Sequence, residues 1–183
     1  ATAPYENLHI LPSSLDLAAA ELEISDKKGR ESILKNALLP IKQYYDYIII
    51  DCPPSLGLIT TNALTASDTF LVPIQCEYYA LEGLTQLMST VRRIKRQYNN
   101  TIDIEGVLLT MYDGRLNLTQ QVVEEVKKFF PRKVFKTVIP RGVRLSEAPS
   151  FGMPVIYYDK NCKGSITYTE LAKEIIAKER SYE

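Results

Sequence analysis

The stretch from Tyr47 to Ser55 reads Y-I-I-I-D-C-P-P-S and indicates the fold more strongly than any other part of the chain. Residues 47–50 run without a polar break, which is typical of a strand buried on both faces of a parallel sheet. The two prolines cannot donate ladder hydrogen bonds, so the strand is expected to stop there. Asp51 then stands at the carboxyl end of a central strand, where open α/β sheets bind ligands. This position predicts either an acid that serves a magnesium–phosphate site or a residue that caps the next turn.

The composition is that of an ordinary globular protein. The chain has 183 residues, enough for one domain with a full core, and is 45% hydrophobic and 24% charged. Lys plus Arg and Asp plus Glu both number 22, so any basic surface must be local. No apolar run approaches the roughly 20 residues of a membrane span. The three cysteines, Cys52, Cys76 and Cys162, fit neither a disulfide framework nor a paired-cysteine metal site, and we expect a cytoplasmic protein.

Strand and helix patterns alternate along the chain. The expected strands cover Leu8–Leu11, Tyr47–Ile50, Asp68–Pro73, Ile104–Thr110 and Val134–Ile139. The expected helices cover roughly residues 15–24, 30–39, 57–66, 80–98 and 118–130, with a last helix from near Thr167. Pro140–Pro154 reads as a long loop and Val155–Tyr158 as extended chain. This alternation predicts an α/β fold with a mostly parallel, twisted sheet flanked by helices. Because no repeat, linker or low-complexity tract interrupts it, residues 1–183 are expected to form one domain.

Four stretches, in order along nearly the whole chain, resemble one family. They are L-H-I-L-P-S-S-L-D-L-A-A-A-E-L (Leu8–Leu22), Y-I-I-I-D-C-P-P-S-L-G (Tyr47–Gly57), P-I-Q-C-E-Y-Y-A-L-E-G (Pro73–Gly83) and P-R-G-V-R-L-S-E-A-P-S-F-G (Pro140–Gly152). The sequence is similar to ParA-type chromosome-partitioning ATPases of the Soj branch, which have a P-loop NTPase fold. The resemblance implies that Asp51 is the catalytic, magnesium-site acid and that it reaches Mg²⁺ through a water molecule.

The sequence departs from this family in one large way. Family members begin with a strand and a Gly-rich deviant Walker A loop with two lysines, whereas this chain has eight glycines and no G-x-x-x-x-G-K-[ST] run. Such a loop cradles phosphates with backbone N–H groups and a Lys side chain. By resemblance the chain corresponds to the C-terminal two-thirds of a member. ATP and Mg²⁺ are the implied cofactors, both need the N-terminal segment, and this chain alone is expected not to hydrolyse ATP.

The resemblance also implies partners and a mechanism. Family members form ATP-bridged homodimers that bind double-stranded DNA without sequence preference. They are released when a ParB-type centromere-binding protein stimulates ATP hydrolysis, which implies a cytoplasmic, nucleoid-associated protein that serves a chromosome or plasmid. By motif, DNA binding falls on Arg115, in M-Y-D-G-R, and on Arg144, in P-R-G-V-R. From the residues alone, each arginine reads instead as a solvated loop residue or half of a local ion pair.

The same resemblance places Pro140 and Gly142 beside the adenine of ATP. Relatives usually have Asn at the second of these positions, so Gly142 removes a side-chain amide there.

Two other functions stay open. A non-catalytic interaction module would keep only surface contacts of the family. Another deviant Walker ATPase, such as a cell-division-site selector, would use a basic amphipathic C-terminal helix at membranes. The tail of this chain, Leu171–Glu183, mixes both signs of charge, so we expect no membrane partner. An iron–sulfur carrier would need paired cysteines, which the sequence lacks.

Overall fold

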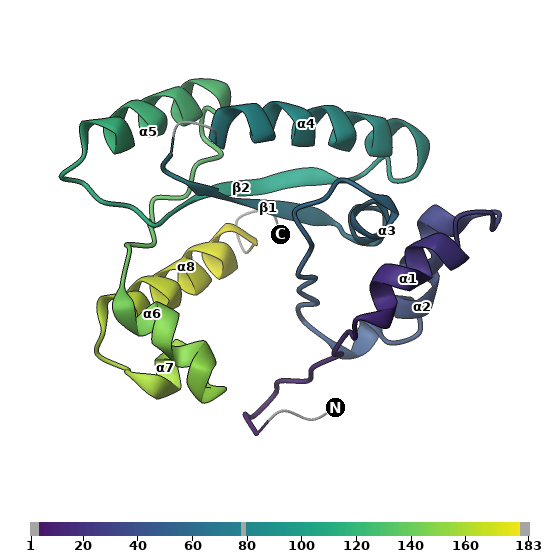
Figure 1. Ribbon diagram of the computed structural model, residues 1–183, viewed down its shortest axis with the longest axis horizontal. Coiled ribbons are helices and arrows are strands. Elements are labelled where there is room, and N and C mark those ends of the chain that lie inside the picture. The colour runs from purple at the N-terminus through teal and green to yellow at the C-terminus, as the bar shows by residue number, and fades with distance from the viewer. Residues whose placement is uncertain (1–3, 78–79, 180–183) are drawn as a thin grey trace. The chain divides into compact units, whose positions relative to one another are not determined.

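The computed structural model describes residues 4–77 and 80–179. These residues form two compact units. The first comprises the chain up to Ser67 together with Arg93–Asn100, and the second comprises Asp68–Arg92 together with the chain from Thr101 onward. Parallel strands with flanking helices confirm the α/β class (Figure 1). The expectation of one domain over residues 1–183 stays a prediction.

The second unit is built on a parallel pair of strands, β1 (Thr69–Gln75) and β2 (Asp103–Thr110). Both strands were expected from the sequence within one or two residues. Their register runs from Thr69 opposite Asp103 to Gln75 opposite Thr110. Residues 106–109 of β2 are all buried, as expected for a strand that is covered on both faces.

Residues 133–140 run along the other edge of β2. Val107 N–H donates to the Lys133 carbonyl at 2.8 Å, and Phe135 N–H donates to the Val107 carbonyl at 3.0 Å. Isolated parallel bridges join Val107 to Val134 and Tyr112 to Pro140. The expected strand Val134–Ile139 is therefore present as extended chain without a regular ladder.

Gly106 makes the close approach of this segment possible. A Cβ at position 106 would lie 2.5 Å from Phe135 Cε2 and 3.0 Å from the Lys133 carbonyl oxygen. Both distances are shorter than ordinary van der Waals contacts, so any side chain here would push the segment away from β2.

Helices cover both faces of the sheet (Figure 1). The first face carries the part of α4 (Ala80–Gln97) that belongs to this unit, up to Arg92, and α5 (Asn117–Phe129), and the second carries α6 (Val143–Glu147) and α8 (Lys163–Glu179). The buried cluster on the first face consists of Val72, Ile74, Cys76, Leu84, Ile104, Val107, Leu109, Val122 and Val126. The cluster on the second face consists of Leu108, Phe135, Ile139 and Leu171, with Leu145 packed against it. Side-chain alternation along β2 sends neighbouring residues to opposite clusters.

The first unit is mainly helical. Its helices are α1 (Asp16–Glu23), η1 (Arg30–Ser32), α2 (Ile33–Leu38), η2 (Lys42–Tyr44) and α3 (Leu58–Ala66). Asn62 on α3 ties this unit together, because its side chain accepts from Leu34 N–H at 3.1 Å and donates to the Arg30 carbonyl at 2.8 Å. Asn99 donates to the Leu64 and Ser67 carbonyls and so satisfies acceptors at the end of α3.

The expected strands in the first unit are wrong. Tyr47–Ile50 is not assigned to a ladder, and three of its four residues are exposed, Ile49 by 91%. Leu8–Leu11 contributes only a single bridge residue at His9. A strand requires a neighbouring strand for its hydrogen bonds, and the sheet found among the described residues consists of β1 and β2. Residue pattern alone does not supply that neighbour.

The predicted structure of residues 140–158 is also wrong. The predicted loop Pro140–Pro154 contains α6 and a 3-10 helix, η3 (Ala148–Phe151), and the predicted extended residues Val155–Tyr158 form a short helix, α7. The run V-R-L-S-E contains no helix breaker, and prolines lie at the starts of η3 and α7, where they are tolerated.

The last helix begins at Lys163, before the expected start near Thr167. The Thr167 hydroxyl donates to the Lys163 carbonyl at 2.9 Å inside the helix and does not cap its start. The tail is described as far as Glu179, so residues 180–183 of the expected charge-mixed segment lie outside the described residues.

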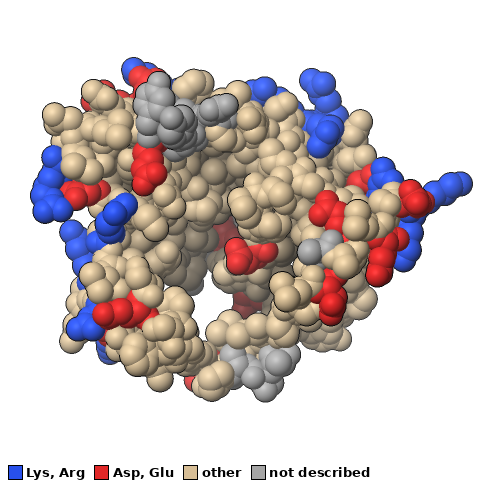
Figure 2. All heavy atoms as spheres, viewed as in Figure 1, with Lys and Arg blue, Asp and Glu red and all other residues tan. Residues whose placement is uncertain are grey.

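The charged side chains of both signs are interspersed in the view of Figure 2, in agreement with the net charge of zero. Within residues 4–77 and 80–179, no helix combines the length and apolar character needed to cross a membrane.

Candidate functional site

Two chain segments of the second unit leave the sheet side by side. Tyr112 N–H donates to the Ile139 carbonyl at 3.0 Å, Tyr112 pairs with Pro140 in a parallel bridge, and Arg141 N–H donates to the Tyr112 carbonyl at 3.4 Å. Residues 111–116 and 140–147 are called the loop pair below. They meet at the carboxyl end of β2, the end at which α/β sheets bind ligands.

Arg115 lies in the first half of the loop pair and is held by Asp113. Its Nε donates to Asp113 Oδ1 at 2.9 Å and its Nη2 donates to Oδ2 at 2.6 Å, while the Arg115 backbone N–H also donates to Oδ1 at 3.1 Å. These hydrogen bonds lower the pKa of Asp113 from 3.8 to about 2. The Arg115 side chain remains 88% exposed, so its outer face can still reach an anion.

Arg144 lies on α6, in the second half of the loop pair, and is held by more partners than Arg115. Its Nη1 donates to Glu147 Oε2 at 2.9 Å, and its Nε lies 3.3 Å from Asp159 Oδ2. The guanidinium carbon lies 6.0 Å from the centre of the Tyr158 ring, and the Tyr158 hydroxyl donates to the same Glu147 oxygen at 3.1 Å. The pKa of Arg144 is raised, mainly because of its hydrogen bond to Glu147.

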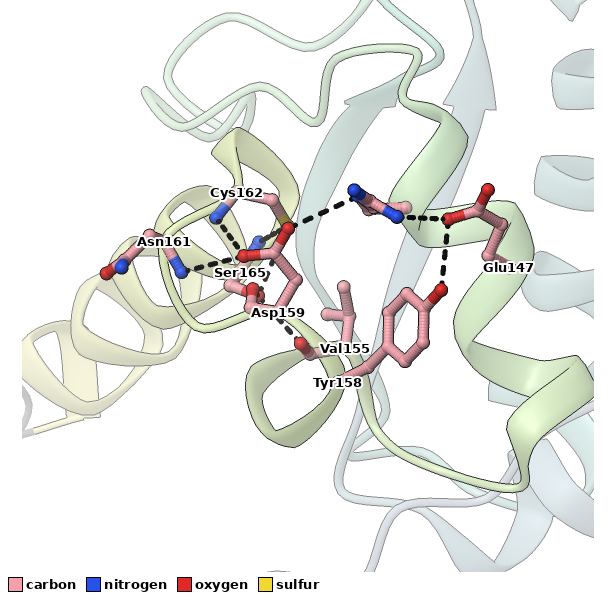
Figure 3. A network of polar contacts seen from close by, with 8 residues as sticks. Glu147, Val155, Tyr158, Asp159, Asn161, Cys162 and Ser165 are labelled. Carbon is pink, nitrogen blue, oxygen red and sulfur yellow. Dashed lines mark hydrogen bonds and ion pairs between the residues drawn. The ribbon is translucent and has the colours of Figure 1, made fainter.

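The same network fixes the turn between α7 and α8. Asp159 Oδ1 accepts from the N–H groups of Asn161 and Cys162, and Ser165 Oγ donates to the carbonyls of Val155 and Asp159 (Figure 3). Arg144 therefore ties α6 to this turn through one carboxylate on each side. Its side chain is 55% exposed.

Pro140 and Gly142, the expected adenine-side positions, lie in the second half of the loop pair. Gly142 immediately precedes α6 and has an extended backbone with φ −155° and ψ 133°, which any residue can adopt. A Cβ built there would meet only Leu145 Cδ1, at 3.9 Å. The missing side-chain amide is thus not a consequence of missing space.

Asp51 lies in the first unit, on the exposed segment between η2 and α3. Its carboxylate makes no hydrogen bond or ion pair with the rest of the described chain. The pKa of the neighbouring Cys52 thiol is raised. Partial burial is the larger cause, and the Asp51 charge is the smaller one. Among the described residues, no group of three or more His, Cys, Asp and Glu is arranged to hold a metal ion.

The exposed Asp51 carboxylate fits Mg²⁺ only in the way that nucleotide hydrolases hold this ion. Mg²⁺ usually keeps several waters and takes one or two carboxylates together with substrate phosphates. An exposed, uncommitted Asp51 can be such a carboxylate, but it cannot hold the ion alone.

The sequence singled out Arg115, Arg144, Pro140 and Gly142 as candidates, but it missed the residues that surround them. Glu147 could have been found, because R-x-x-E places both side chains on one helix face, but that argument needs a helix where a loop was expected. Asp159 and Arg141 carry no local signal, since they depend on contacts between segments far apart in the chain.

Comparison with known proteins places the chain in one group. The AAA domain family model matches residues 1–104. The sporulation initiation inhibitor protein Soj of Bacillus subtilis is 60% identical over 172 residues, which cover 94% of this chain and 68% of that protein. The chromosome-partitioning ATPase Soj of Treponema pallidum is 49% identical over 178 residues, which cover 97% of this chain and 70% of that protein.

A solved structure with a similar fold is cobyrinic acid a,c-diamide synthase from Mycobacterium smegmatis with bound ADP and magnesium. It matches with a TM-score of 0.79 at 34% identity and covers 94% of this chain and 63% of its own. The chain therefore spans about two-thirds of the length of these proteins.

Proposed function

The chain belongs to the Soj/ParA family of chromosome-partitioning ATPases, and we propose that it acts as an ATP-bridged homodimer that binds double-stranded DNA without sequence preference. Release follows when a ParB-type centromere-binding protein stimulates ATP hydrolysis. The protein then works in the cytoplasm, on the nucleoid, in segregating a chromosome or plasmid.

The observation that carries the DNA-binding part of this proposal is the loop pair. Tyr112 and Pro140 bring Arg115 and Arg144 to one edge of the second unit, and both side chains are more than half exposed. Guanidinium groups bind phosphate oxygens with a planar fork of N–H donors. Contacts of this kind do not distinguish bases, which suits binding without sequence preference.

The nucleotide part of the proposal assigns Asp51, Pro140 and Gly142. Asp51 is the acid that holds Mg²⁺ through a water molecule, and Pro140 and Gly142 lie beside the adenine. An ion held there would supply positive charge beside the phosphates. The similar synthase from Mycobacterium smegmatis, which holds ADP and magnesium, supports a nucleotide site in this fold.

The test uses the loop-containing protein, by which we mean this chain joined to an N-terminal strand and phosphate-binding loop. Arg115→Ala and Arg144→Ala are compared with the parent in filter binding to two unrelated duplexes over a salt series, and ATP-dependent dimerisation is measured in parallel. Each phosphate contact that is lost should flatten the slope of log affinity against log salt by about one unit.

We expect both variants to bind the two duplexes equally weakly and to dimerise normally, because neither side chain is assigned to the nucleotide. A variant that binds one duplex normally and loses the other would show that the arginine reads bases. Parent-like binding at every salt concentration would show that the DNA surface lies elsewhere.

A further inference from the structure

Arg141 stands between the two halves of the loop pair and has no role in the function proposed above. Its backbone N–H donates to the Tyr112 carbonyl. The Arg141 backbone therefore lies next to the turn that contains Asp113 and Arg115. It also follows Pro140, which the bridge to Tyr112 fixes in place. The position of Arg141 is therefore set by the sheet edge and not by a mobile loop tip.

The Arg141 guanidinium is weakly held. Its Nη2 lies 3.8 Å from Glu77 Oε1, and the two side chains are 70% and 62% exposed. Ion pairs of that length between exposed groups contribute little to stability, so an incoming anion can replace the carboxylate. By contrast, Arg144 lies between the two carboxylates of Glu147 and Asp159.

Arg141 also acts on the same carboxylate as Arg115. Its charge contributes to the lowering of the Asp113 pKa, after the larger effects of Arg115. Arg115 and Arg141 thus start from neighbouring backbone segments, and a phosphate is a common anion that binds between two guanidinium groups.

We propose that Arg141 is a third phosphate-binding residue of this surface, next to Arg115, and that the ligand is the DNA backbone. This inference rests on the proposed function. It deepens it by assigning a residue whose side chain is more easily released for DNA than that of Arg144.

The experiment measures fluorescence anisotropy of a labelled random-sequence duplex with the loop-containing protein over a salt series. Arg141→Ala removes two contacts from a dimer, so the slope of log affinity against log salt should flatten by roughly two units. Arg141→Lys keeps a point charge for phosphate and should retain most of the slope. Arg92→Ala, which removes the same charge from an exposed position on α4, should leave the slope unchanged.

Asp113→Asn gives a readout with the opposite sign. Without the competing carboxylate, both arginines should bind DNA more tightly, by about threefold to tenfold at low salt, and the gain should fade as salt rises. A purely structural role for Asp113 would instead weaken binding in this variant.

The remaining outcomes overturn the inference in distinguishable ways. If the parent binds duplex and Arg141→Ala keeps the parental slope, Arg141 does not contact phosphate and the proposed function stands. If Arg141→Ala loses ATP affinity while its DNA slope is unchanged, Arg141 serves the nucleotide. If the parent binds no duplex at any salt concentration, the proposed function fails and this inference fails with it.

Discussion

Replacing Glu174 by alanine should destabilise the second unit, because this one carboxylate of α8 holds two successive backbone N–H groups beside β2. Lys136 N–H donates to Oε1 at 2.8 Å and Thr137 N–H donates to Oε2 at 3.0 Å. Hydrogen bonds to a charged group contribute about 1.5–3 kcal/mol each. Glu174 is only partly buried, so water replaces part of this, and we expect a loss of about 1–2 kcal/mol in the free energy of unfolding.

The measurement is thermal and urea unfolding at pH 7. A loss of that size lowers Tm by about 2–8 °C for a protein of this length. Glu170→Ala is the matched control, since it removes an exposed carboxylate from the preceding turn of the same helix. It should change Tm by much less.

The pH dependence gives a second check on the same contact. Partial burial raises the pKa of Glu174, but the N–H groups of Lys136 and Thr137, the Thr137 side chain and Lys178 outweigh it, so the pKa is lowered. A lowered carboxyl pKa stabilises the fold above its ordinary value of 4.5, and this contribution is lost as the pH falls through the folded-state pKa. The effect of Glu174→Ala should therefore be full at pH 7 and shrink in acid. An effect equal to that of Glu170→Ala, or one that does not change with pH, would refute the reasoning.

Three further outcomes are expected. The 183-residue chain should hydrolyse ATP no faster than a blank, and in the loop-containing protein Asp51→Ala should abolish magnesium-dependent turnover; an unchanged rate would remove Asp51 from the magnesium site. The isolated chain should bind a hydrophobic dye or associate, because residues 47–49 are exposed and apolar; a monomeric species that melts sharply and ignores the dye would contradict this. Gly142→Asn should leave Tm unchanged, because a Cβ there meets only Leu145 at 3.9 Å. It should tighten ATP binding by about threefold to tenfold if the added amide reaches the adenine. A drop in Tm or an unchanged ATP affinity would count against placing residue 142 beside the adenine.

Local pattern was sufficient where an element is fixed by its own residues. The helices α4 and α5 and the strands β1 and β2 were expected within a few residues, because apolar periodicity and burial agree in them. Residues 47–50 have the same apolar character but form no strand, since a ladder depends on a neighbour that the pattern does not contain.

The candidate site was predictable only in part, for the same reason. The motifs indicated which arginines to consider. Their carboxylate partners were not predictable. Asp113 is local to Arg115, but Asp159 reaches Arg144 only because α6 and α7 form in a region whose prolines and glycines suggested a loop.

The contact between Gly106 and Phe135 links two positions in the evolution of the family. A Cβ at position 106 would overlap the end of the Phe135 ring, which a shorter side chain could relieve, and would press on the Lys133 carbonyl, which no substitution removes. Relatives with alanine at the first position should therefore have a residue smaller than phenylalanine at the second, and β-branched residues should be absent from the first. The two columns of an alignment should covary, and the double variant Gly106→Ala/Phe135→Leu should lose less stability than the sum of its single changes.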